Sequence, residues 1–171
     1  MKRKTSTSDY KYRALIGEAK PMLQLASRFS ETTQLVDLAN NLYMIPLTEI
    51  AFKLLNKVYE DDDAYVVMEG TDDLTVNLFS TLSRFSEIGI IIYLEDTLTD
   101  QIRSESVFVW NHSTLNPDKY MDANAINEVL RLIGVKATEG KTEYQTLEIP
   151  AYINKTRHLN YGYNPFLDQN S

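Results

Sequence analysis

Carboxylates at the expected ends of two strands are the side chains of this sequence best suited to chemistry. One group follows a strand expected at 64–69, and the other follows a strand expected at 88–94. The five residues are Glu69, Asp72, Asp73, Glu95 and Asp96. If the two strand ends meet, these oxygens can hold two Mg²⁺ ions that drive in-line phosphoryl transfer. The chain would then be a divalent-metal-dependent phosphotransferase or nuclease.

A structural role explains the same acids without a metal. Asp72 and Asp73 fall in the first turn of an expected helix, where carboxylates interact favourably with the helix dipole. Glu95 and Asp96 begin a polar segment that we expect to be a loop. No glycine-rich phosphate-binding loop accompanies the acids. We therefore predict no metal, no cofactor and no catalytic residue, and keep the metal enzyme as the alternative.

Other catalytic chemistries are poorly represented. The absence of cysteine excludes disulfides, thiolate nucleophiles and cysteine-based zinc sites. The only histidines, His112 and His158, have no partner at the spacing of metal ligands. The composition therefore favours a protein that is not an enzyme.

Charge is distributed unevenly along the chain. The net charge is −7, yet residues 1–13 carry +4 and residues 14–149 carry −12. An acidic body repels nucleic-acid phosphates. We therefore expect no nucleic-acid partner, except through the basic N-terminal arm.

The central part of the sequence predicts one α+β domain. Ile88–Leu94 is the most apolar run, with three consecutive isoleucines, and indicates a strand buried on both faces. Strands at 64–69, 88–94, 106–110 and 143–149, with helices at 74–85 and 125–133, give the order β-α-β-β-α-β over 64–149. This order is that of a ferredoxin-like antiparallel sheet. In it, 88–94 pairs antiparallel with 106–110 and lies next to 143–149 or 64–69.

Residues 12–59 read as helical and complete a domain at 12–149. Apolar residues recur at helical spacing in 12–19, 21–29, 32–43 and 47–58. Pro21 separates the first two helices, and Asn40-Asn41 and Pro46 bound the third. We expect these N-terminal helices to cover the free face of the sheet.

Two ends without periodic patterning flank this domain. Residues 1–11 form a basic arm, and residues 150–171 form an arm rich in aromatic residues and asparagine. Aromatic residues are enriched where proteins meet, whereas disordered tails are depleted in them. The residues predicted to contact partners are Lys2, Arg3, Lys4, Tyr152, Arg157, Tyr161, Tyr163 and Phe166.

These features predict a non-enzymatic structural subunit of a large complex, with other proteins or copies of itself as partners. Its most concrete form is a connector, neck or tail-ring protein of a bacteriophage virion. A further alternative is a small acidic adaptor or inhibitor. No signal peptide or membrane-spanning run is evident, so we expect an intracellular protein, or a virion component, with no membrane partner.

Overall fold

The computed structural model describes residues 9–27, 35–48, 76–112 and 117–156. These residues form a six-stranded antiparallel sheet in the order β2-β3-β1-β4-β5-β6. The strands are β1 (Tyr10–Glu18), β2 (Val36–Asp37), β3 (Leu42–Pro46), β4 (Ile91–Thr99), β5 (Ile102–Trp110) and β6 (Asp118–Tyr120). The helices are α1 (Ala19–Ala26), α3 (Val76–Phe85), α4 (Ala125–Leu132), α5 (Glu143–Thr146) and α6 (Ile149–Thr156), with a 3₁₀ turn, η1 (Ser86–Ile88).

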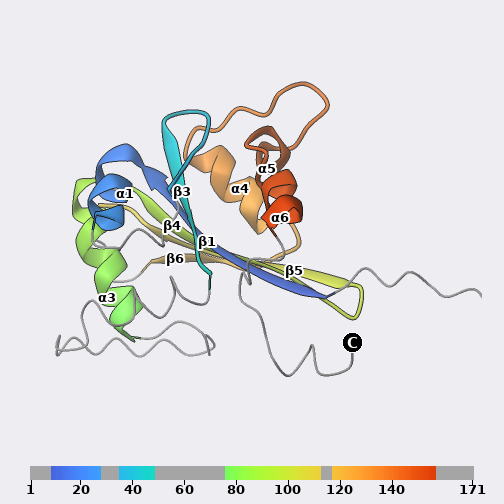
Figure 1. Cartoon of the computed structure of the whole chain (residues 1–171), viewed down its shortest axis with the longest axis horizontal. Coiled ribbons are helices and arrows are strands. Elements are labelled where there is room, and N and C mark those ends of the chain that lie inside the picture. Colours follow the sequence, from blue (N-terminus) through green and yellow to red (C-terminus); the bar gives the residue numbers. More distant parts are fainter. Residues whose placement is uncertain (1–8, 28–34, 49–75, 113–116, 157–171) are drawn as a thin grey trace, which may run out of the picture.

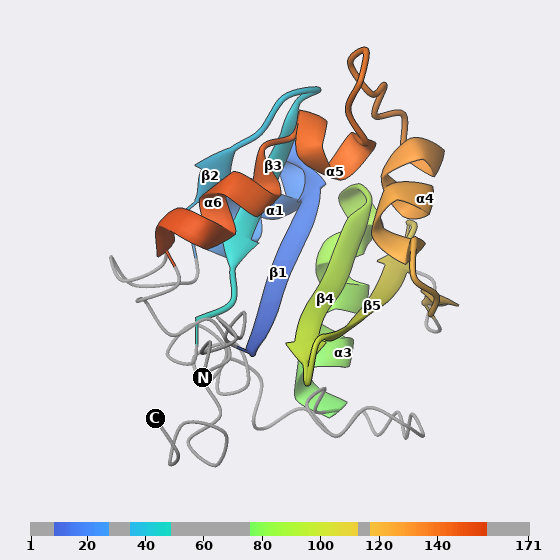
Figure 2. The same ribbon diagram turned by 90° about the vertical axis from the view of Figure 1, so that its right-hand side faces the viewer.

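Helices cover both faces of the sheet, so the described part has three layers (Figure 1). Figure 2 shows α4, α5 and α6 on one side of the strands and α1 and α3 on the other. Each helical layer buries its own apolar cluster against the sheet. No helix among these residues has the length and apolarity needed to cross a membrane.

The prediction of a central strand buried on both faces is confirmed for residues 91–94, whereas Ser86–Ile88 forms the 3₁₀ turn and Ile88 is 41% exposed. Ile92 and Leu94 pack toward α4 and α6, whereas Ile91 and Tyr93 pack toward α1 and α3. All four are at most 1% exposed. The predicted antiparallel pairing of this strand with 106–110 is also confirmed. Its other neighbour is β1, so the prediction that it lies next to 64–69 or 143–149 is wrong.

The helix predicted at 12–19 is wrong, because residues 10–18 form strand β1. Alternate side chains of β1 face opposite apolar clusters: Tyr12, Ala14 and Ile16 face one, and Leu15 faces the other. Apolar residues on both faces also match helical spacing, so this strand resembles a helix in sequence. Residues 10–17 of β1 pair with β4 and residues 14–18 pair with β3, and this pairing overrides the helical periodicity. At its end, Gly17 is required because a Cβ there would lie 2.6 Å from the Ile90 carbonyl oxygen.

The predicted helix at 32–43 is also corrected, since residues 36–46 form the β2–β3 hairpin. Asn40 and Asn41 have φ angles of 64° and 57° and make the turn. Turns with two positive φ values are typical of tight hairpins, and asparagine tolerates that conformation well. Of the helix predicted at 47–58, only residues 47 and 48 are described, and they are not helical.

At the C-terminal end, the strand predicted at 143–149 is replaced by helices. Thr142 and Gln145 form a reciprocal capping box that starts α5. Pro150 lies in the first turn of α6, where a missing N–H costs nothing. Ile153 of α6 is 6% exposed, so the part of the expected C-terminal arm at 150–156 belongs to the folded body.

The coarser prediction of a mixed α/β fold with an antiparallel sheet is confirmed, and the ferredoxin-like arrangement is not. The segment expected as its fourth strand, 143–149, is helical, and the segment expected as its first strand, 64–69, lies outside the described residues. Helices are confirmed near the expected places as α1, α3 and α4. The polar segment expected as a loop at 95–104 instead extends β4 and β5, which meet in a two-residue turn at Asp100-Gln101.

Candidate functional site

The acids of the alternative metal-site hypothesis do not form one site among the described residues. Glu95 and Asp96 are neighbours in β4, so their side chains point to opposite faces of the sheet. Glu69, Asp72 and Asp73 lie outside the described residues. Where the structure is described, no group of three His, Cys, Asp or Glu side chains is placed to hold a metal ion. Glu95 and Asp96 therefore cannot share one cation.

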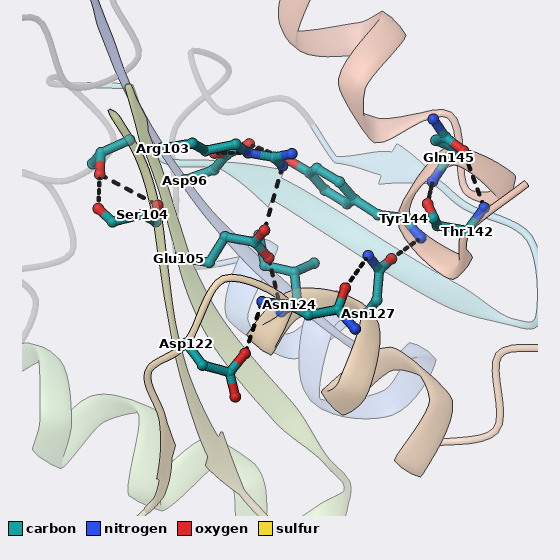
Figure 3. Close-up of polar contacts among 12 residues, drawn as sticks. Asp96, Arg103, Ser104, Glu105, Asp122, Asn124, Asn127, Thr142, Tyr144 and Gln145 are labelled. Atoms are coloured by element: carbon teal, nitrogen blue, oxygen red, sulfur yellow. Dashed lines mark hydrogen bonds and ion pairs between the residues drawn. The ribbon is translucent and has the colours of Figure 1, made fainter. Parts of the chain in front are cut away.

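Asp96 is the centre of a buried polar cluster between the sheet and α5 (Figure 3). Its side chain is 2% exposed. Oδ1 accepts hydrogen bonds from the Tyr10 hydroxyl at 3.2 Å and Arg103 Nε at 3.0 Å. Oδ2 accepts from Arg103 Nη2 and the Tyr144 hydroxyl, both at 3.1 Å. Four bonds fill the acceptor capacity of a carboxylate, so Asp96 has none left for a ligand.

Arg103 links this cluster to solvent. Its side chain is 47% exposed and lies over the Tyr144 ring, 5.8 Å from the ring centroid. The hydrogen bonds to Asp96 raise the pKa of Arg103, which is therefore charged at every physiological pH. Burial, followed by the charge of Asp96, raises the pKa of Tyr144 well above its ordinary value. Tyr144 thus remains a protonated hydrogen-bond donor.

Glu105 extends the cluster to the start of α4. Its Oε1 accepts the Ile126 backbone N–H at 3.0 Å, and its Oε2 lies 3.6 Å from Arg103 Nη2. An anion at a helix N-terminus is favoured by the helix dipole. Burial nevertheless raises the pKa of Glu105 above its ordinary value, against the opposing effects of the Ile126 N–H and Arg103. Glu105 therefore fixes α4 on the sheet.

Glu95 lies in a separate polar group on the other face. The Tyr93 hydroxyl donates to Glu95 Oε1 at 2.5 Å. Buried Arg13 of β1 stands opposite Glu95 in the strand register. Burial and then the charge of Glu95 raise the pKa of Tyr93 well above its ordinary value, so this phenol also stays protonated. Both carboxylates of the 95–96 pair are thus engaged with protein groups.

Beside the Asp96 cluster, one half of β5 has an open edge. β4 pairs with all of β5, whereas β6 pairs only with residues 107–109. No other described strand lies beyond residues 102–106, which we call the open edge. Residues 102–104 are exposed, whereas Glu105 is 5% exposed, so the accessible part of the open edge is 102–104. An unpaired edge presents backbone N–H and C=O groups that another strand can bind.

The groups that face outward from the open edge follow from the hairpin turn. Asp100 and Gln101 have φ angles of 52° and 66°, as in a two-residue hairpin that hydrogen-bonds Thr99 to Ile102. Backbone groups alternate in direction along an antiparallel strand. Ile102 and Ser104 therefore direct their backbone groups toward β4, and Arg103 and Glu105 direct theirs outward.

Among the predicted contact residues, only Tyr152 is described. It lies in α6, partly buried against the apolar cluster under α4 and α6. The others, Lys2, Arg3, Lys4, Arg157, Tyr161, Tyr163 and Phe166, lie outside the described residues. Tyr152 therefore gives part of its surface to the fold rather than to a partner.

An open cavity of about 600 Å³ lies at the opposite end of the sheet from the β4–β5 turn. Its lining is mixed, with Glu18, Lys20, Asn40 and Asn41 beside Ile88, Ile90 and Ile133. The Glu18 carboxylate already accepts the Ile90 N–H at 2.9 Å. This cavity gathers no set of groups that would act together on a substrate.

Sequence reasoning missed Arg103, Glu105, Tyr144 and the open edge. Residues 95–104 read as a polar loop because their side chains lack apolar alternation. The two positive-φ residues of the turn, an Asp-Gln pair, are not a strong hairpin signal. Tyr144 fell in a segment taken as a strand. The local signal was limited to Ile102, the one apolar residue between the turn and the strand predicted at 106–110.

Comparison with protein-family models, curated proteins and solved structures gave no match to this chain.

Proposed function

We propose that this protein is a non-enzymatic assembly subunit that binds another protein by adding a strand to the open edge of β5. The observation that carries the proposal is the mismatch between nine-residue β5 and three-residue β6. Among the described strands, residues 102–106 have a neighbour, β4, on one side only. Adding a partner strand to such an edge is a recurring mode of protein recognition.

The contacts around the open edge favour a rigid docking strand over an active site. Asp96 and Arg103 connect β4 to β5, and the Thr97 and Ser104 hydroxyls form a second side-chain bond across the pair. Preorganisation of this kind lowers the entropic cost of binding. The acids of the cluster are occupied by these structural contacts, so they are not available as general acid, base or metal ligand.

The most concrete form of the proposal is a connector, neck or tail-ring subunit of a bacteriophage virion. Neighbouring subunits in such an assembly would join at this edge, with further contacts from the basic N-terminal and aromatic C-terminal arms. Within the described ranges, no geometry supports the alternative of a metal-dependent phosphotransferase, because the side chains of Glu95 and Asp96 point to opposite faces of the sheet.

The proposal is tested by comparing Arg103→Pro with Arg103→Ala. Both changes remove the ion pair with Asp96, but only proline also removes the outward N–H of residue 103. Proline is tolerated on an edge strand, because that N–H serves no bond within the sheet. We expect the wild type and Arg103→Ala to migrate in an assembly larger than 19.7 kDa in extracts of the producing cells. We expect Arg103→Pro to migrate at its own mass.

Thermal unfolding of both purified variants serves as the control for folding. Equal melting temperatures would assign any difference in assembly to the edge N–H. Retention of Arg103→Pro in the assembly would contradict the proposal. So would a wild-type protein found only at its own mass.

A further inference from the structure

We infer that the strand added to the open edge is residues 1–8 of a neighbouring copy, which we call the basic segment. This inference rests on the proposed function and names its partner. It uses only the accessible part of the edge, residues 102–104. Two features of the described chain carry it, namely the place where the basic segment joins the folded body and the acidic surroundings of the edge.

The basic segment joins the described chain beside the β4–β5 turn. Asp9 Oδ1 accepts the backbone N–H of Asp100, in that turn, at 3.0 Å. In the strand register, Tyr10 is opposite Leu98, and Leu98 is opposite Arg103. The attachment point of the segment and the accessible edge therefore lie at the same end of the sheet. Each copy offers a strand and a place for a strand.

Carboxylates lie at both ends of the accessible edge. Asp100 precedes it in the turn, and Asp122 lies beyond it, close enough to Glu105 for their charges to interact (Figure 3). Asp100 and Asp122 are exposed, and neither forms an ion pair within the described part of the chain. The guanidinium of Arg103 is already engaged with two carboxylates of its own copy. The edge therefore has acidic groups available for a cationic partner.

The composition of the basic segment suits an acidic strand edge. It reads Met-Lys-Arg-Lys-Thr-Ser-Thr-Ser, with three cationic side chains and no acidic one. It contains no proline, which could not donate a backbone hydrogen bond to the edge, and its two threonines favour strands. Opposite charges on neighbouring strands are favourable. A strand of this composition therefore brings cations to Asp100 and Asp122.

Arg103 supplies the backbone contact. Val107 and Val109 pair with β6 on the outer side of β5, and Arg103 follows the same alternation. Its N–H and C=O can therefore bind one residue of the basic segment. This pair leaves the buried Glu105 untouched. The added strand would also cover Ile102, which is 71% exposed.

A neighbouring copy is favoured over the chain's own basic segment. To reach the outer side of β5, the own segment must cross three strand spacings of about 4.8 Å, roughly 14 Å in all, and then reverse direction. At about 3.3 Å per residue, the crossing alone takes about four of its residues. A neighbour's segment keeps its whole length for pairing. Because the contact joins two different surfaces, it repeats from copy to copy and can close a ring.

Mixing two full-length variants tests the inference. The first combines Lys2→Glu, Arg3→Glu and Lys4→Glu and keeps the edge intact. The second, Arg103→Pro, keeps the basic segment and loses the outward N–H of the edge. We expect each purified variant alone to stay at its own mass, and the mixture to form a complex containing both chains. Native mass spectrometry measures both. The complex should weaken in 1 M salt, where the Debye length falls to about 3 Å.

The matched control combines Lys2→Arg, Arg3→Lys and Lys4→Arg, which keeps the charge of the segment and should assemble as the purified wild type does. A mixture without a joint complex would overturn the inference. So would a glutamate variant that assembles like the wild type. If that variant assembles while Arg103→Pro does not, the added strand comes from elsewhere and the proposed function stands. If Arg103→Pro also assembles alone, the proposed function fails as well.

Discussion

The two halves of β5 pair with the same neighbour and are held by different forces. Residues 107–110 are paired on both sides over most of their length, and Val107, Phe108 and Trp110 are at most 1% exposed. Residues 102–106 are held by hydrogen bonds and an ion pair to β4 and α4, and most of them face solvent. Burial thus secures one half, and side-chain polar bonds keep the other in strand geometry, with no described strand on its outer side.

The largest effect is expected from removing apolar burial in the paired half. Phe108→Ala should lower the free energy of unfolding by about 3–5 kcal/mol, because it leaves a cavity between Tyr93 and Trp110. Urea denaturation measures the loss. Ser104→Ala in the open half is the control, expected to change stability by less than about 0.5 kcal/mol. Similar losses for both variants would remove the distinction between the halves.

A smaller effect is expected from the polar contacts of the open half. Asp96→Ala should cost about 2–3 kcal/mol, because it leaves the buried Tyr144 hydroxyl without its acceptor and Arg103 with only the more distant carboxylate of Glu105. The cost stays below that of a fully buried ion pair, since Arg103 can regain water.

Tyr144→Phe is the partial version of this change, with an expected cost of about 1 kcal/mol. Chemical denaturation measures the loss of unfolding free energy in both variants. A loss below about 0.5 kcal/mol for Asp96→Ala would show that the cluster does not support the hairpin.

The smallest effect is a pH dependence that distinguishes Glu105 from Glu143. Burial raises the folded-state pKa of Glu105, so its contribution to stability is present below its unfolded pKa of about 4.3 and is lost as pH rises through the folded value. The hydrogen bond from Arg131 lowers the pKa of Glu143, so that contribution is lost as pH falls. Free energies of unfolding measured between pH 3 and pH 7 give, for each variant, a difference from wild type at each pH. This difference should change with pH in opposite directions for Glu105→Gln and Glu143→Gln. Equal slopes would contradict these assignments.

The parts of the fold that could be predicted are those where burial dominates. Ile91–Leu94 is apolar at every position and is buried on both faces, and α4 combines periodic apolar residues with a glycine after its end. The same reasoning placed 106–110 as a strand and paired it correctly. In these segments the apolar composition and spacing within the segment itself indicate the element.

The failures occurred where partners distant in sequence decide the structure. β1 has spacing compatible with helix and strand, and only pairing with β3 and β4 makes it a strand. The polar half of the β4–β5 hairpin depends on Tyr144, 48 residues from Asp96 in the chain. No local pattern encodes such a contact, so Asp96 was seen as an acid of interest while its partners were not.

The divergence of Glu95 and Asp96 bears on how the sheet finds its alignment. A one-residue slip of β4 would send each side chain to the opposite face. Such a slip would cost little in the run Ile91–Leu94, because both faces there are apolar. It would, however, take Asp96 away from Arg103 and take Glu95 away from its position opposite Arg13. The two carboxylates therefore specify the register of a strand whose apolar half, Ile91–Leu94, has apolar residues toward both faces of the sheet.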